Sequence, residues 1–92
     1  MKQIKKINTP DLHQLLTPEL LGQAIKARRT QSNLRLEDAA ALCSVAKQTF
    51  MNAEHGQKTS QFGSVLKICS ELGIKLYIAP WQSDDEVNDD WQ

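Results

Sequence analysis

The 92-residue sequence has no long apolar run and few of the residues on which metal and disulfide sites depend. No stretch approaches the roughly 18 apolar residues that span a bilayer, and the Lys-rich start lacks the apolar core of a signal peptide. Cys43 and Cys69 lie far apart without a C-x-x-C pair, which is typical of small buried hydrophobes and not of zinc or disulfide sites. We therefore expect a cytoplasmic protein without a membrane segment, a metal or a cofactor.

Motifs of catalysis are equally scarce. The four glycines are scattered, so no phosphate-binding loop is present. His13 and His55 are expected on helices, and so small a domain scarcely encloses the pocket that a catalytic triad needs. The acidic residues near the C-terminus lack the ligand spacing and the turn glycine of a calcium loop. The sequence therefore predicts a protein that is not an enzyme.

Basic residues are missing from the last eleven positions. All 11 Lys and Arg residues but only six of the 11 Asp and Glu residues precede residue 82, so the zero net charge combines a +5 body with a −5 tail. This asymmetry indicates a basic binding surface joined to an acidic interaction tail, which we expect to be disordered over residues 81–92. Trp91 is the one large apolar group near its end.

Hydrophobic periodicity and capping signals predict five helices. Thr9-Pro10 and Thr17-Pro18 each combine a hydroxyl cap with a proline at the first helical position. The last helix is expected to be capped by Thr59 or Ser60, to end at Gly73 and to point Phe62 inward. The helices are expected over residues 10–16, 18–31, 36–43, 46–54 and 61–72.

After the last helix the apolar period changes from 3.6 to 2. Ile74, Leu76 and Ile78 alternate with other residues until Pro80, which predicts a strand over 74–80. A lone strand needs a partner for its backbone, and the same strand of a second copy supplies one across a two-fold axis. We thus expect an all-α homodimer with an arm and short helix over 1–17, a helix-turn-helix domain over 18–73, a dimerisation strand and an acidic tail.

Helices 36–43 and 46–54, separated by two residues, form a helix, a tight turn and a helix. The second presents side chains with the donors and acceptors for base edges in a major groove, Lys for guanine and Gln or Asn for adenine. We predict that these base-reading residues are Lys47, Gln48, Thr49 and Asn52. The basic residues expected to hold phosphates are Arg28, Arg29, Arg35 and Lys58.

Residues 21–76 resemble the Xre/Cro-type helix-turn-helix repressors, with motif spacing that matches without a gap. The motifs are Leu21-Gly22-x-x-Ile25-Lys26-x-x-Arg29, Leu34-x-x-Glu37-Asp38-Ala39-Ala40, Val45-x-x-x-Thr49-Phe50-x-x-x-Glu54-x-Gly56 and Leu66-Lys67-Ile68-x-x-x-Leu72-Gly73-Ile74. The resemblance implies a five-helix lambda-repressor-like domain that binds palindromic operator DNA, with Lys47, Gln48 and Asn52 at base-reading positions. Leu36 stands where many members have a DNA-contacting Gln, and Arg35 is its candidate substitute.

The Lys6-Ile7-x-x-Pro10 start, the strand after the last helix and the polar tail ending near Trp91 resemble HipB-type antitoxins. These are the Xre-family partners of HipA-like Ser/Thr kinase toxins. The resemblance implies a DNA-binding antitoxin and autorepressor that acts in the cytoplasm at the nucleoid and neutralises such a kinase. Trp91 is then either an anchor on the kinase, or a tail residue that is unattached or folded back on its own domain. The alternatives are a stand-alone or phage-type repressor and a protein-interaction module without DNA binding.

Overall fold

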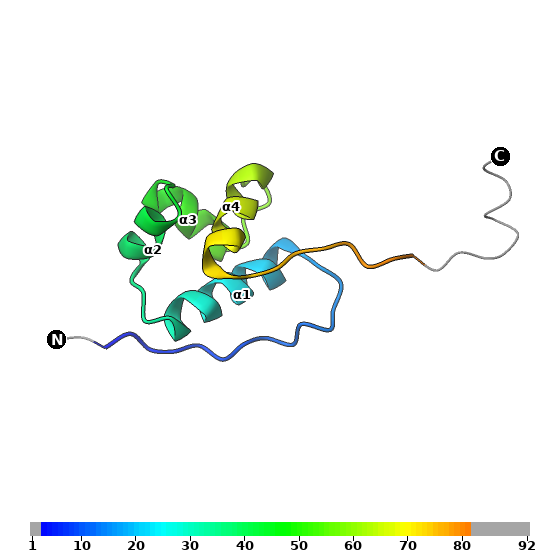
Figure 1. Ribbon diagram of the computed structural model, residues 1–92, viewed down its shortest axis with the longest axis horizontal. Coiled ribbons are helices and arrows are strands. Elements are labelled where there is room, and N and C mark those ends of the chain that lie inside the picture. Colours follow the sequence, from blue (N-terminus) through cyan, green and yellow to red (C-terminus); the bar gives the residue numbers. More distant parts are fainter. Residues whose placement is uncertain (1–2, 82–92) are drawn as a thin grey trace, which may run out of the picture.

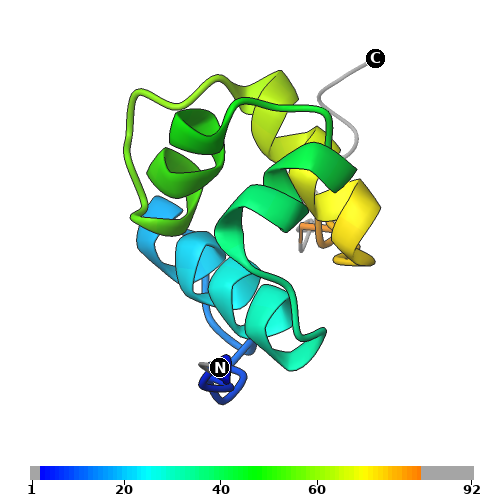
Figure 2. The ribbon, with the colours of Figure 1, turned by 90° about the vertical axis from the view of Figure 1, so that its left-hand side faces the viewer.

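Four α-helices make up the regular structure of residues 3–81, which are the residues that the computed structural model describes (Figure 1). The helices are α1 (Pro18–Gln31), α2 (Leu36–Leu42), α3 (Lys47–Glu54) and α4 (Phe62–Leu72). α3 packs against both α1 and α2, and α4 closes the other side of the core against α1 and α3 (Figure 2). The all-α class is confirmed, and no residue from 3 to 81 lies in a β-strand.

The ends of α1 and α4 follow from local chemistry. The hydroxyl of Thr17 accepts a hydrogen bond from the Leu20 N–H at 3.0 Å, and Pro18 begins the helix without wasting an N–H donor. α4 ends at Gly73, whose φ of 77° lies in the left-handed region that glycine adopts without strain. Ser60 does not cap α4: Gln61 holds that position without a side-chain hydrogen bond, and the Ser60 hydroxyl is buried without a partner.

The core lies where the four helices meet. Its fully buried large side chains are Phe50, Ile25, Ile68, Cys43 and Cys69. Burial, and to a smaller extent the neighbouring Cys43, raise the pKa of the Cys69 thiol to about 11. Burial likewise raises the pKa of Cys43. Both cysteines are therefore packing residues held in the unreactive thiol form.

Phe62 is 70% exposed, so its predicted place in the core is wrong. The buried residues of α4 are Ile68, Cys69 and Leu72, all in its second half. Phe62 is the first residue of α4, whereas Val65 and the buried residues after it pack against the core, and the apolar spacing of the sequence does not reveal where that contact begins.

The predicted short helix over 10–16 does not form. Asp11 instead makes a local turn, in which its carboxylate accepts from the His13 N–H at 2.9 Å. Seven residues are too few to form a stable helix without a surface to pack on, and Leu12, Leu15 and Leu16 are all more than half exposed. Residues 3–9 form an extended arm along α1, where the Ile7 N–H donates to the Thr30 hydroxyl at 3.0 Å.

The predicted strand over 74–80 is likewise absent in the single chain. The Ile74 N–H donates to the Cys69 carbonyl at 2.8 Å and so completes the end of α4. Ile74 and Leu76 pack partly against the core, whereas Tyr77 and Ile78 are 87% and 86% exposed. Beyond Ile74, residues 75–80 make no backbone–backbone hydrogen bond within residues 3–81, so the segment is not part of a sheet.

Candidate nucleic-acid interface

The turn between α2 and α3 is short and tightly held. Ser44 adopts a φ of 58°, and the Val45 N–H donates back to the Ala40 carbonyl at 3.0 Å. Ala39 and Ala40 are buried, and their small side chains let α2 approach α3 closely. The structure therefore contains the predicted helix, tight turn and helix, with the second helix fixed in orientation.

The outer side of α3 carries the predicted base-reading residues. Phe50 and Ala53 face the core, so Lys47 and Gln48 are exposed and Asn52 is half-buried on the opposite side. Thr49 is half-buried at the edge of this side, because it lies one helical turn before the buried Ala53.

Met51 is a further residue on the outer side of α3 that was not among the predicted base readers. It follows Lys47 by four positions and is half-buried. The spacing of four residues from Lys47 is the sequence signal that places Met51 on the outer side of α3. An apolar side chain on such a face suits the methyl group of thymine.

Two of the side chains are linked to each other. The Gln48 side-chain N–H donates to the Asn52 side-chain carbonyl at 2.9 Å, across one turn of the exposed side of α3. Both amides are therefore oriented relative to the helix before any ligand arrives.

Charges of both signs meet where α2 and α3 begin. The carboxyl of Glu37 has a pKa below its ordinary value, first because it accepts a hydrogen bond from its own backbone N–H and then because of the positive charge of Lys47. Arg35 lowers the same pKa further. The positive charges of Arg35 and Lys47 therefore both act on the Glu37 carboxyl. Arg35 is exposed and is the residue directly before α2.

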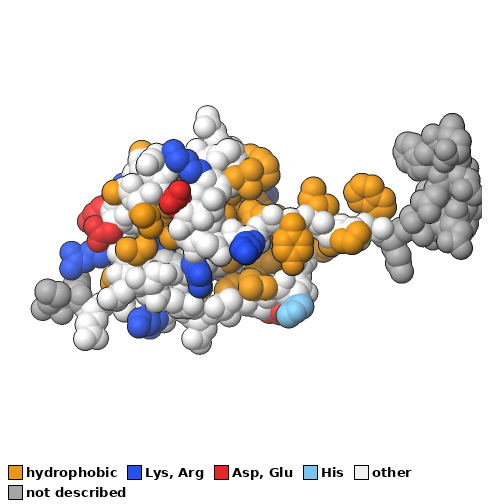
Figure 3. Space-filling view, viewed as in Figure 1, with side chains coloured by type: hydrophobic (Ala, Val, Ile, Leu, Met, Phe, Trp, Pro, Cys, Tyr) orange, Lys and Arg blue, Asp and Glu red, His pale blue; other side chains and the backbone are white. Residues whose placement is uncertain are grey.

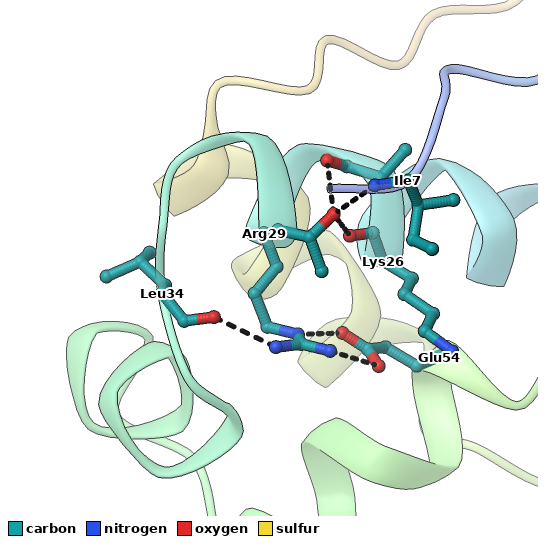
Figure 4. A network of polar contacts seen from close by, with 7 residues as sticks. Ile7, Lys26, Arg29, Leu34 and Glu54 are labelled. Carbon is teal, nitrogen blue, oxygen red and sulfur yellow. Dashed lines mark hydrogen bonds and ion pairs between the residues drawn. The ribbon is translucent and has the colours of Figure 1, made fainter. Parts of the chain in front are cut away.

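Arg29 lies in the interior and is not placed to hold a phosphate. It is only 7% exposed, and its guanidinium forms a two-pronged ion pair with Glu54 and donates to the Leu34 carbonyl at 2.9 Å (Figure 4). This burial disagrees with the expectation that Arg29 holds a phosphate. The pair joins α1 to the last residue of α3 and to the loop before α2.

Arg28 also has an internal partner. Its Nε donates to the Leu72 carbonyl at 2.8 Å, at the C-terminus of α4, where a cation offsets the partial negative charge of the helix end. Of the four predicted phosphate ligands, only Arg35 and Lys58 are exposed and lack a polar contact within residues 3–81. Leu36 is partly buried and packs against the core. An apolar side chain therefore stands at the position where many Xre/Cro-type members have a DNA-contacting Gln.

Two further classes of site find no support in the part of the chain that is described. No three His, Cys, Asp or Glu side chains come together there in a way that holds a metal ion. None of its helices combines the length and the apolar character that crossing a membrane requires.

No profile of a known protein family matches the chain. A curated relative does: the uncharacterized HTH-type transcriptional regulator y4mF of Sinorhizobium fredii is 31% identical over 62 residues, which cover 67% of this chain and 82% of that protein. The chain belongs to the helix-turn-helix transcriptional regulators.

The fold of this regulator is that of HipB. A chain of the HipB–O4 20mer complex superposes on it with a TM-score of 0.67, covering 77% of this chain and all of that one, at 18% sequence identity. The predicted resemblance to helix-turn-helix regulators with a HipB-like domain is confirmed.

Proposed function

We propose that this regulator is a transcriptional repressor that places α3 in the major groove of an operator, where Lys47, Gln48, Thr49 and Asn52 read base edges. The observation that carries the proposal is the outer side of α3, whose polar side chains stand opposite buried Phe50 on a helix that α1 and α2 hold in place. Donors and acceptors fixed on a rigid helix are what direct base readout requires. The relative y4mF, named as a transcriptional regulator, and the HipB–O4 20mer complex support the same role.

Arg35 and Lys58 are the phosphate ligands of this proposal. Both are exposed, and one precedes α2 while the other lies in the loop after α3, so they flank the reading helix on two sides. Phosphate contacts of this kind fix the register of the protein on the duplex and make affinity fall as salt rises. Arg28 and Arg29 are left out because their guanidinium groups have protein partners.

Removing Lys47 and Gln48 together should weaken operator binding and broaden its sequence preference. Each base contact contributes about 1 to 3 kcal/mol, so the double alanine variant is expected to lose at least 10-fold in affinity. Fluorescence anisotropy at fixed salt, on an operator selected from a random duplex library, measures the loss.

The matched control for that variant is Arg35→Ala with Lys58→Ala. These changes should weaken binding to all sequences alike and lower the salt slope by about one for each phosphate contact. Unchanged affinity and preference in the Lys47 and Gln48 variant would show that α3 does not read the bases.

The regulator is further proposed to act as a homodimer joined through Ile74, Leu76 and Ile78. Apolar side chains gather along the segment that leaves α4, and Tyr77 and Ile78 are almost fully exposed there (Figure 3). A twin segment paired antiparallel would supply partners for its backbone groups and cover these side chains. Two copies of α3 related by a two-fold axis match a palindromic operator.

A HipA-like Ser/Thr kinase toxin is the proposed protein partner, with autorepression of the shared operon in the cytoplasm, at the nucleoid. The fold shared with HipB supports this. Trp91, the proposed kinase anchor, and the acidic residues around it lie outside the described residues. A stand-alone repressor without a toxin is the second candidate, and neither candidate is an enzyme.

Purification of the regulator with its native chromosomal neighbours tests dimer and partner together. Light scattering should give a dimer, and a kinase-like protein should elute with it but not with a variant lacking residues 82–92. A monomer would remove the strand pairing. A dimer that carries no kinase would leave the stand-alone repressor.

A further inference from the structure

We propose that Gln48 and Asn52 act as one unit that reads a single adenine in each operator half-site. The inference rests on the proposed function, in which the outer side of α3 faces the bases. It starts from the hydrogen bond between the two amides, 2.9 Å long and lying on the exposed side of the helix. A bond between two side chains at this place is part of the surface that a base would meet.

The pair has a defined set of free hydrogen-bonding groups. Each amide carries one carbonyl acceptor and two N–H donors. The bond uses one N–H of Gln48 and one lone pair of the Asn52 carbonyl, which leaves the Gln48 Oε1 as an unused acceptor, the Asn52 Nδ2 as an unused donor group and a second N–H on Gln48. If both amides are turned over, the bond runs the other way and again leaves one carbonyl and one NH₂ group unused. The chemistry of the pair is therefore the same in either orientation.

One acceptor beside one donor matches adenine among the four bases. In the major groove, adenine presents its N6 donor next to its N7 acceptor. Guanine presents two acceptors, so it would engage only N–H donors of the pair and leave the unused Gln48 carbonyl without a donor. Cytosine presents only a donor at this edge and thymine only an acceptor with its methyl group, so each would leave half of the pair unsatisfied.

Joining the two amides also lowers the cost of ordering them. Free Gln and Asn side chains lose rotamer freedom when they bind, and a bond that exists before binding has already removed part of it. If the two amides read separate bases, the Asn52 carbonyl would have to serve both this bond and its own base, or the bond would have to break. The structure thus favours one adenine for the pair over one adenine for each residue.

The two arrangements predict different results in a double-mutant cycle. When the pair reads one base, Gln48→Ala and Asn52→Ala each remove the same contact, so the double variant should lose no more affinity than either single one. When each amide reads its own base, the two losses should multiply and fall on two different base pairs. Both side chains lie on the outer side of α3, and alanine favours helix, so all three variants should fold.

The experiment selects operators from a random duplex library with the wild-type protein and the three variants. The wild type should select an adenine that all three variants cease to select at the same base pair. Affinity of the wild type should fall about 5- to 150-fold when that adenine is replaced by 7-deazaadenine, which lacks the N7 acceptor, whereas the variants should be indifferent to the replacement.

Three results would overturn the inference, and they separate it from the proposed function. Relaxation at two different base pairs, or losses that multiply, would show that the two residues read separately. Full retention of preference by these three variants, together with loss of preference in an added Lys47→Ala variant, would remove the pair but keep the repressor. A wild-type protein that selects no sequence would remove both.

Discussion

Replacing Arg29 with alanine should lower the free energy of unfolding by about 3 to 5 kcal/mol, a large share of the roughly 5 to 15 kcal/mol that holds a domain together. The Glu54 side chain is only 4% exposed, so the variant would bury a carboxylate without a counter-charge and leave the Leu34 carbonyl without a donor. Urea unfolding followed by circular dichroism measures the change. Glu54→Ala should lower the free energy of unfolding by a similar amount, because it leaves the Arg29 guanidinium buried without a counter-charge.

An apolar replacement of both partners provides the control. Arg29→Met combined with Glu54→Leu removes both charges while keeping most of the volume, and such exchanges are often neutral. The double variant should therefore be more stable than either single alanine variant and should keep α3 in place. If the double variant also keeps its operator affinity, Arg29 contributes to the fold and not to DNA binding. If Arg29→Ala weakened DNA binding without affecting unfolding, the phosphate role expected from the sequence would be restored.

The spacing of Arg29 from other residues of α1 indicates that its side chain is buried. Arg29 follows Gly22 by seven residues and Ile25 by four, and all three are buried on one stripe of the helix. The prediction that Arg29 holds a phosphate relied on its residue type and not on its place in the helix, because arginine is rarely buried without a partner. The partner, Glu54, is 25 residues away along the chain, and no local signal connects the two.

Local signals predicted α1 correctly and failed at residues 10–16, although both segments open with threonine and proline. The difference is tertiary: α1 packs against α3 and α4 and has five buried residues, whereas the leucines of 10–16 are all more than half exposed. Caps select where a helix starts, but packing decides whether it exists. Residues 74–80 make the same point for a strand, because the period of 2 predicts an extended backbone but the proposed pairing would require a second chain.

The outer side of α3 was the part of the site that the sequence predicted best. Buried Phe50 and Ala53 leave one side for polar residues, and periodicity alone places Lys47, Gln48 and Asn52 there. The bond between Gln48 and Asn52 depends on rotamers and was not predicted, although spacing of four residues permitted it. Periodicity therefore predicts which side chains lie on the outer side of α3, and the structure adds how they are joined.

Gly22→Ala is the second change expected to have a large effect, with a loss of about 3 kcal/mol of stability or more. A Cβ at this position would lie 2.8 Å from the carbonyl oxygen of Ala53 and closer still to that of Glu54, at the C-terminal end of α3. Backbone carbonyls have no rotamer through which to move, so α1 and α3 would have to separate. That shift would strain the ion pair between Arg29 and Glu54 and displace the reading helix.

Gly63→Ala is the matched control for that change. Gly63 lies in α4 with nothing within 4 Å of its Cβ position, so alanine there should stabilise the helix by about 0.5 to 1 kcal/mol. Opposite signs for the two glycines in thermal unfolding would tie the cost at Gly22 to the approach of two helices and not to the residue type. Operator affinity extends the comparison, because only a displaced α3 reduces it: Gly22→Ala should weaken binding even under conditions where it remains folded, and Gly63→Ala should not. Equal stability in both variants would mean that α1 and α3 tolerate a wider separation than their contact implies.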